Sequence, residues 1–161
     1  MKFSLAAVAS TLMATALAAP TTSAADDGST SYQIKDFTLR KLNGKDISTM
    51  SFRILATNGG TLDFECVPYD PVTNGATENF QGDHVYSCGE NTFFSFNYIP
   101  KHDTQTNELY LWQNVSDTVT LGGSAFLDDP ICRAGGAGVD DLVCKVPEQV
   151  HFVIPMRNLL A

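Results

Sequence analysis

Apolar residues alternate with polar residues along most of the chain beyond residue 31, and turn-forming residues interrupt this alternation at short intervals. A period of two places successive side chains on opposite faces of a strand, so the pattern predicts an all-β fold. No window of about 12 residues has the spacing of an amphipathic helix. The predicted strands are Tyr32–Leu39, Met50–Thr57, Thr61–Val67, His84–Cys88, Phe93–Tyr98, Asn107–Val115, Val119–Leu127 and Gln149–Ile154.

The segment Asn58-Gly59-Gly60 separates two of these strands and indicates a hairpin. A two-residue turn would place Ile54 opposite Asp63 and mix apolar and polar side chains on each face. A three-residue loop with a glycine in the left-handed conformation separates the two faces, and we predict it. Its pairs are Phe52 with Cys66, Ile54 with Phe64 and Ala56 with Leu62 on the apolar face, and Arg53 with Glu65 on the polar face.

A second hairpin is expected around Ser116-Asp117-Thr118. The predicted core-facing pairs are Val115 with Val119, Leu111 with Gly123, and Leu109 with Ala125. The opposite face then carries Tyr110, Trp112, Asn114, Thr120 and Ser124. Exposed aromatic side chains often anchor protein binding, so Tyr110 and Trp112 are partner-binding candidates. The tripeptide Asn114-Val115-Ser116 is an N-glycosylation sequon at the hairpin tip, which makes Asn114 a glycosylation candidate.

Two longer connections, Tyr69–Asp83 and Cys132–Cys144, are rich in turn-forming residues. Loops held by a rigid scaffold commonly carry recognition, so both are candidate binding segments. The second contains the adjacent carboxylates Asp140 and Asp141, which we include among the partner-binding candidates. Solvation of loop charges is the simpler explanation for both residues.

The first 18 residues combine a positive charge at Lys2, an apolar stretch from Phe3 to Leu17 and a small-residue cleavage motif. This arrangement is typical of a secretory signal peptide, and Ala19 is the expected mature N-terminus. Residues 19–30 are small and polar and are expected to form a flexible leader. Residues 31–161 are expected to form one domain. The mature protein should therefore be extracellular.

Four cysteines in a secreted chain indicate disulfide bonds, and they allow three pairings. The most economical pairing joins Cys66 to Cys88 and Cys132 to Cys144, because each bond then closes a loop of roughly 10–25 residues. There is no Cys-x-x-Cys motif and no histidine beside any of the four. We therefore predict two structural disulfides.

The chain carries a formal net charge of −8, which becomes −9 when Lys2 is removed with the signal peptide. This balance argues against nucleic acid and anionic membranes as partners. The sequence also lacks the motifs of serine hydrolases, zinc peptidases and phosphate-binding loops. The histidines His84, His102 and His151 are scattered, and we expect no catalytic centre, metal or cofactor. A secreted hydrolase whose residues assemble from distant positions remains a third alternative.

Three motifs carry a family resemblance: ATNGGTLDF, YSCGEN, and CRAGG followed by a valine-cysteine pair. In this order and with this cysteine spacing, the chain resembles the Alternaria alternata allergen 1 family of fungal secreted proteins over about residues 31–155. The resemblance implies a single compact antiparallel β-barrel, whereas the residue pattern alone leaves a barrel and a sandwich equally open. It also implies a protein without a catalytic centre.

The same resemblance implies an allergen, effector or elicitor that binds a plant defence protein of the thaumatin-like class. An extracellular carrier of a small apolar, flavonoid-like ligand is the alternative that the family suggests. The family's type member has a cysteine near its mature N-terminus that joins two chains. Residues 19–36 contain no cysteine here, so we expect a monomer or a non-covalent dimer.

Overall fold

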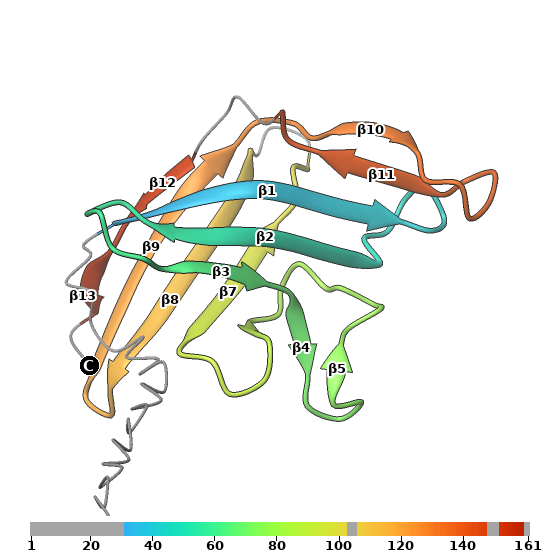
Figure 1. The fold of residues 1–161 in the computed structure, drawn as a ribbon. Helices are drawn as coiled ribbons and strands as arrows, with labels where there is room; N and C mark the ends of the chain where they lie inside the picture. Colours follow the sequence, from blue (N-terminus) through green and yellow to red (C-terminus); the bar gives the residue numbers. More distant parts are fainter. Residues whose placement is uncertain (1–30, 103–105, 148–151, 160–161) are drawn as a thin grey trace, which may run out of the picture.

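The computed structural model describes residues 31–102, 106–147 and 152–159, and every regular element within these ranges is a β-strand (Figure 1). The strands are β1 (Ser31–Lys41), β2 (Thr49–Ala56), β3 (Asp63–Cys66), β4 (Pro68–Asp70), β5 (Gly75–Ala76), β6 (Tyr86–Cys88), β7 (Phe94–Ile99), β8 (Asn107–Ser116), β9 (Val119–Leu127), β10 (Ile131–Ala134), β11 (Leu142–Lys145), β12 (Phe152–Pro155) and β13 (Arg157–Leu159). This confirms the all-β fold class.

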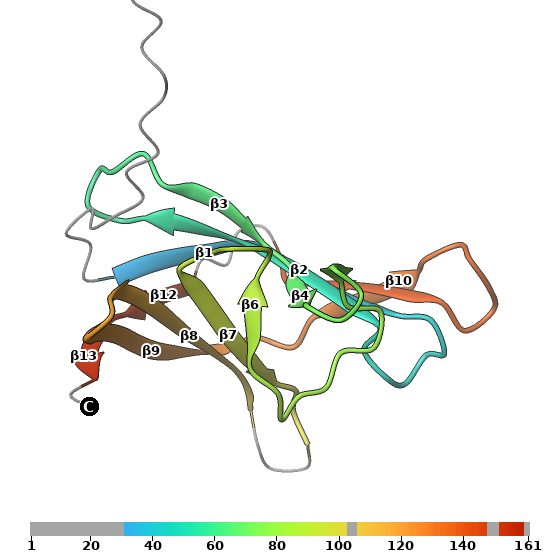
Figure 2. The same ribbon diagram turned by 90° about the horizontal axis from the view of Figure 1, so that it is seen from below.

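The strands form two antiparallel sheets. The first sheet has the order β10-β11-β1-β2-β3, and β12 also pairs with β1. The second sheet has the order β13-β9-β8-β7-β6-β4-β5. Figure 2 shows the two sheets from below, with the β10–β11 hairpin and the β1–β2 turn reaching beyond the second sheet.

The core lies between the sheets because one side of nearly every long strand is apolar. Ile34 and Ile54 of the first sheet and Leu109 of the second are fully buried. Aromatic rings meet across the gap: the ring centroids of Phe52 and Phe96 are 5.0 Å apart in an edge-to-face arrangement. Such pairs add specific geometry to the burial of large apolar surfaces.

A β-bulge in β1 changes which side chains enter this core. Asp36 has a φ of 53°, and the pairing with β2 shifts between Lys35 and Thr38. The inserted residue reverses the alternation, so the even positions Tyr32 and Ile34 and the odd positions Phe37 and Leu39 are all buried. A bulge of this kind increases local twist and bends the strand over the core.

The chain passes between the sheets at three points: through residues 128–130 between β9 and β10, and at two places where a single residue separates the strands. Val67 separates β3 of the first sheet from β4 of the second, and Met156 separates β12 of the first from β13 of the second. Within the described ranges no strand pairing joins the two sheets into one closed barrel. The single barrel therefore stays a prediction, and the observed architecture is two packed antiparallel sheets connected by short segments of the chain.

The predicted register of the first hairpin is confirmed. Phe52 pairs with Cys66, Arg53 with Glu65, and Ile54 with Phe64. The amide of Ala56 donates to the carbonyl of Leu62 at 3.1 Å, and Gly59 has the expected positive φ of 84°.

The second hairpin confirms the pairs Leu109–Ala125 and Leu111–Gly123 but not Val115–Val119. Val119 pairs with Ser116 instead, because Val115 forms a bulge before a two-residue turn at Asp117-Thr118. The segment Cys132–Cys144 was predicted as a loop, but strands β10 and β11 pair and form a hairpin there. The short strands β4, β5 and β13 were not predicted either.

Both predicted disulfides are present. Cys66–Cys88 joins the two sheets, and both cysteines are fully buried. Cys132–Cys144 joins facing residues of the β10–β11 hairpin, and Cys132 is exposed. The expected signal peptide, the leader and the first part of the strand predicted at Gln149–Ile154 lie outside the described residues.

Candidate binding surfaces

The outward side of β8 presents Tyr110 and Trp112, as its register predicts. Tyr110 lies between Asn97 of β7 and Ser124 of β9. The ring centroids of Tyr110 and Trp112 are 6.0 Å apart with an interplanar angle of 12°. Both side chains are half-buried, so each keeps surface available to a partner.

Further large apolar side chains lie on the same side of the second sheet. Register places Ile99 and Phe126 beside Glu108, and Leu159 beside Thr120. Phe126 is 67% exposed and Phe93, just before β7, is 53% exposed. We call this surface the aromatic face and define it as Phe93, Ile99, Tyr110, Trp112, Phe126 and Leu159.

Gly122 shapes the centre of the aromatic face. A Cβ atom at this position would lie 2.7 Å from Leu159 Cδ1 and 3.0 Å from Trp112 Cδ1. Because glycine leaves this space open, the indole of Trp112 and the side chain of Leu159 both reach over β9. The result is a continuous apolar area that spans β8, β9 and β13.

One polar atom on this face has no partner. Within the described ranges, Asn97 Oδ1 is the buried side-chain oxygen or nitrogen that makes no hydrogen bond. A buried acceptor without a donor is costly, but this oxygen is shielded from solvent and is not exposed to a docking partner. Next to it, the Glu108 side chain and burial raise the pKa of the Tyr110 hydroxyl, which therefore remains a hydrogen-bond donor.

The β10–β11 hairpin is held at its tip by a bidentate ion pair. Arg40 donates from Nε to Asp141 Oδ1 and from Nη2 to Oδ2, both at 2.9 Å. The amide of Ala137 also donates to Oδ2 at 2.8 Å. The hydrogen bonds from Arg40 and Ala137 hold the pKa of the Asp141 carboxyl below its usual range. Gly135 makes room for this carboxylate, because a Cβ there would lie 2.3 Å from Oδ2.

This anchor separates the two aspartates that the sequence proposes as binding residues. The Asp141 side chain is only 1% exposed and its oxygens are already used, so it shapes the hairpin and offers no surface to a partner. The expectation of a direct partner contact from Asp141 is therefore corrected. Asp140 is exposed and stays a candidate; its backbone packs against Gly44 of the β1–β2 turn.

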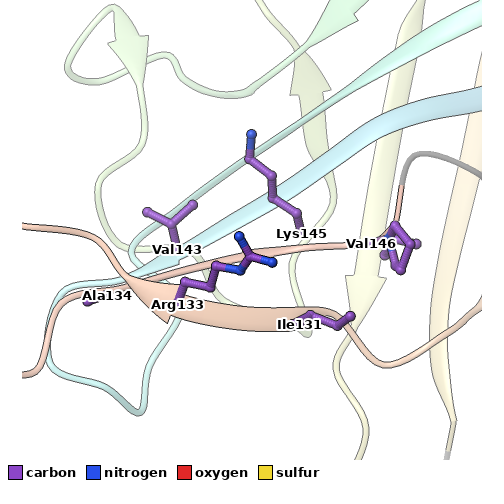
Figure 3. A pocket seen from close by; sticks show the side chains of 7 residues that line it. Ile131, Arg133, Ala134, Val143, Lys145 and Val146 are labelled. Atoms are coloured by element: carbon purple, nitrogen blue, oxygen red, sulfur yellow. The ribbon is translucent and has the colours of Figure 1, made fainter.

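A groove runs along the outer side of the same hairpin and has a volume of about 470 Å³. Figure 3 shows the side chains of Arg133, Val143 and Lys145 on one side of the hairpin. The lining residues are Ile131, Arg133, Ala134, Val143, Lys145, Val146 and Pro147. The groove therefore combines an apolar floor with two cations in a protein that is acidic overall.

The described residues do not assemble a recognisable catalytic or metal site. No three His, Cys, Asp or Glu side chains in ranges 31–102, 106–147 and 152–159 are placed to hold a metal ion. Asp129 is bound by Lys101 at 2.7 Å and by Asn107 at 2.9 Å, and the hydrogen bond from Lys101 lowers its pKa. His151 lies outside these ranges. No helix among the described residues is suited to crossing a membrane.

Sequence reasoning found Tyr110, Trp112 and Asn114 on one outward face but missed much of their surroundings. Phe126 was derivable, because Ala125 was assigned to the core and the next side chain must point outward. Leu159 was not, since it reaches the face through the unpredicted strand β13. Arg133 and Lys145 were not singled out, because nothing in their local sequence shows that they share one groove.

Comparison with known proteins gives consistent matches. The family model described as Alternaria alternata allergen 1 matches residues 34–144. The major allergen Alt a 1 of Alternaria alternata is 35% identical over 128 residues, which are 80% of this chain and 74% of that protein. Allergen Ulo b 1 of Alternaria botrytis is 37% identical over 114 residues, which are 71% of this chain and 74% of that allergen. A crystal structure of Alternaria alternata major allergen Alt a 1 matches with a TM-score of 0.68 at 34% identity, and the match covers 82% of this chain and 96% of the allergen chain.

Proposed function

Because this chain belongs to the Alternaria alternata allergen 1 family, we propose that it is a secreted, non-enzymatic binding protein whose aromatic face docks a plant defence protein. The proposed partner is of the thaumatin-like class, and the outcome is altered plant immunity. The relatives are named as allergens and not as enzymes, which is consistent with a role in binding.

The aromatic face is the observation that carries this proposal. Exposed apolar side chains scattered singly are ordinary, but contiguous patches mark interaction sites. Here Trp112 and Tyr110 lie at the centre of the face, and Phe126 and Leu159 lie around them with large exposed fractions. Tryptophan and tyrosine are the residues most enriched among those that dominate binding energy.

The charge of the protein supports a basic partner. The net charge of −8 for the full chain creates a negative field that accelerates encounter with a positively charged protein. The apolar face would then supply the short-range contacts. This division predicts that salt slows association, while loss of an aromatic side chain accelerates dissociation.

The test is the binding of residues 19–161, with both disulfides intact, to a purified basic thaumatin-like protein. Phe126→Ser and Trp112→Ala should each weaken binding by about 10-fold or more, the size expected for central interface residues. Val139→Ser is the matched control, because Val139 is fully exposed but lies on the hairpin tip. Equal affinity of the wild type and both face variants would contradict docking on this face, provided that circular dichroism shows folded proteins.

The hairpin groove favours a second function, the transport of a small apolar ligand with an anionic or phenolic group. Its floor of Ile131, Val143 and Val146 would bury the ring system, and Arg133 and Lys145 would contact the acidic oxygen. A flavonoid should then raise the melting temperature of the wild type. Arg133→Ala should abolish that shift, whereas Lys45→Ala, an exposed cation in the β1–β2 turn, should leave it unchanged. An equal shift in both variants would exclude this groove as the site.

A further inference from the structure

Asn114 lies where the aromatic face meets the β8–β9 turn, and its side chain is exposed. Its backbone amide donates to the carbonyl of Phe93 at 2.8 Å, which fixes the residue at the end of the sheet. Its side-chain oxygen accepts a hydrogen bond from the Thr120 hydroxyl at 3.1 Å. The amide nitrogen Nδ2 makes no hydrogen bond to the described residues, so the atom that a glycan would occupy is available.

Apolar side chains lie near Asn114 along β8, just before β7 and, beyond β9, on β13. Trp112 lies two positions earlier on the same side of β8, and Phe93 lies opposite on the β7 side. On the β9 side Thr120 is the neighbour, and beyond it Leu159 of β13 pairs with Thr120. The side chains of Leu159 and Trp112 both lie over Gly122. Phe93 and Leu159 are 53% and 45% exposed. A single polar amide therefore stands beside an uncovered apolar surface.

We propose that Asn114 carries an N-linked glycan whose first N-acetylglucosamine packs on Trp112 and Leu159. The donor is a lipid-linked oligosaccharide diphosphate of the secretory pathway. The Asn114 Nδ2 atom attacks C1 of the first sugar, and a C–N bond forms while the bond from C1 to the diphosphate oxygen breaks. The Nδ2 proton passes to a base and the lipid diphosphate leaves, with no oxidation or reduction. The sequon Asn114-Val115-Ser116 supplies the acceptor.

The packing follows from the shape of the sugar. One face of N-acetylglucosamine presents only C–H bonds, and an electron-rich indole is a favourable surface for it. Contact would remove part of Trp112 and Leu159 from water, which stabilises the folded protein. The glycan would cover Trp112 and Leu159 and leave Tyr110, Phe126 and Ile99 open, so the loss of affinity expected for Trp112→Ala applies to protein produced without the glycan. This inference rests on the secretory route of the proposed function and not on the plant partner.

The test is expression of residues 19–161 in a eukaryotic host behind the host's own signal peptide. Intact mass should show a glycan on the wild type and none on Ser116→Ala, which removes the sequon but keeps Asn114. Endoglycosidase H should then trim the glycan to its first sugar. The sequence contains one tryptophan, so its fluorescence reports on Trp112 alone. The trimmed protein should emit at shorter wavelength and melt a few degrees higher than Ser116→Ala.

A relocated glycan provides the matched control. Gly60→Ser creates a sequon at the exposed Asn58, where the residue two positions earlier is Ala56 instead of tryptophan. Combined with Ser116→Ala, it should carry a sugar without shifting the emission. A wild-type mass without a glycan would overturn the site. A glycan at Asn114 that leaves both emission and melting temperature equal to those of Ser116→Ala would overturn the packing. Neither the glycan mass nor the fluorescence and melting shifts depend on plant-protein binding, so failure of the proposed function would leave both outcomes unchanged.

Discussion

The two disulfides close loops of comparable length but hold very different regions together. Cys66–Cys88 lies in the core, where it ties β3 of the first sheet to β6 of the second. Cys132–Cys144 lies within one hairpin beyond the second sheet, and one of its cysteines is exposed. The loops span 22 and 12 residues, so the restriction of the unfolded chain contributes about 3 kcal/mol in each case. Their difference therefore comes from the folded state.

The difference shows that cysteine spacing predicts a bond but not its structural role. The core disulfide is surrounded by apolar side chains of both sheets, so its loss affects packing as well as chain entropy. The hairpin disulfide has the Arg40–Asp141 ion pair as a neighbour in the same hairpin, where the ion pair supplies a second, independent restraint. Each restraint can be removed separately.

Removal of the core disulfide should have the largest effect. Cys66→Ser combined with Cys88→Ser should lower the free energy of unfolding by more than about 3 kcal/mol, because two hydroxyls are buried in addition to the lost restraint. Denaturant unfolding should show one cooperative transition at a lower midpoint. Cys66→Ala with Cys88→Ala is the control for the hydroxyls and should be less destabilising. A midpoint within experimental error of the wild type would contradict the role of this bond.

Removal of the hairpin disulfide should cost less. Cys132→Ser combined with Cys144→Ser should lower stability by less than the core pair, because Cys132 is exposed and only the hydroxyl at the buried Cys144 enters the core. Hydrogen exchange should accelerate mainly in β10 and β11, while amides of β2 and β8 keep their protection. An unchanged melting temperature, or equal acceleration in both sheets, would refute a local restraint.

The smallest effect should come from the ion pair, and it should depend on pH. Asp141→Asn removes a carboxylate whose pKa is lowered in the folded protein, so the contribution to stability is present above the ordinary carboxyl pKa of about 4 and is lost as the pH falls through the lower folded pKa. The stability gap between wild type and variant should therefore be constant near neutral pH and shrink in acid. Asp140→Asn, at the exposed neighbour, is the matched control and should show no such gap. A stability gap that persists in acid would contradict the dependence of this contribution on the ionised Asp141 carboxylate.

Much of the fold was predictable where both faces of a strand carry a clear pattern. The β2–β3 register follows from placing Phe52 and Ile54 on one side and Arg53 on the other, and the same logic placed Tyr110 and Trp112 outward. The bulge at Val115 was not predictable, because a one-residue shift beside a turn leaves the preceding alternation unchanged. The groove was missed because Cys132–Cys144 was predicted as a loop, whereas its lining residues lie on the paired strands β10 and β11 and just after β11.

The burial of Asp141 shows the same limit for single residues. In the sequence it is one of two adjacent aspartates in a glycine-rich segment, and nothing distinguishes it from Asp140. Its partner Arg40 is 101 residues away. Gly135 leaves the space that the Asp141 carboxylate occupies, and the sequence alone does not show that the two residues meet. Long-range pairing therefore decided which aspartate was available at the surface.

The passage of the chain through Met156 has a consequence for the order in which the protein is made. The strand that precedes it, β12, pairs with β1, so that Ile154 lies opposite Tyr32. The strand that follows it, β13, pairs with β9 at the other sheet. β1 therefore waits for β12, and neither sheet is complete until β12 and β13 have been synthesised. Contacts this distant along the chain slow folding, so this protein should rely on chaperones while its sheet edges remain open.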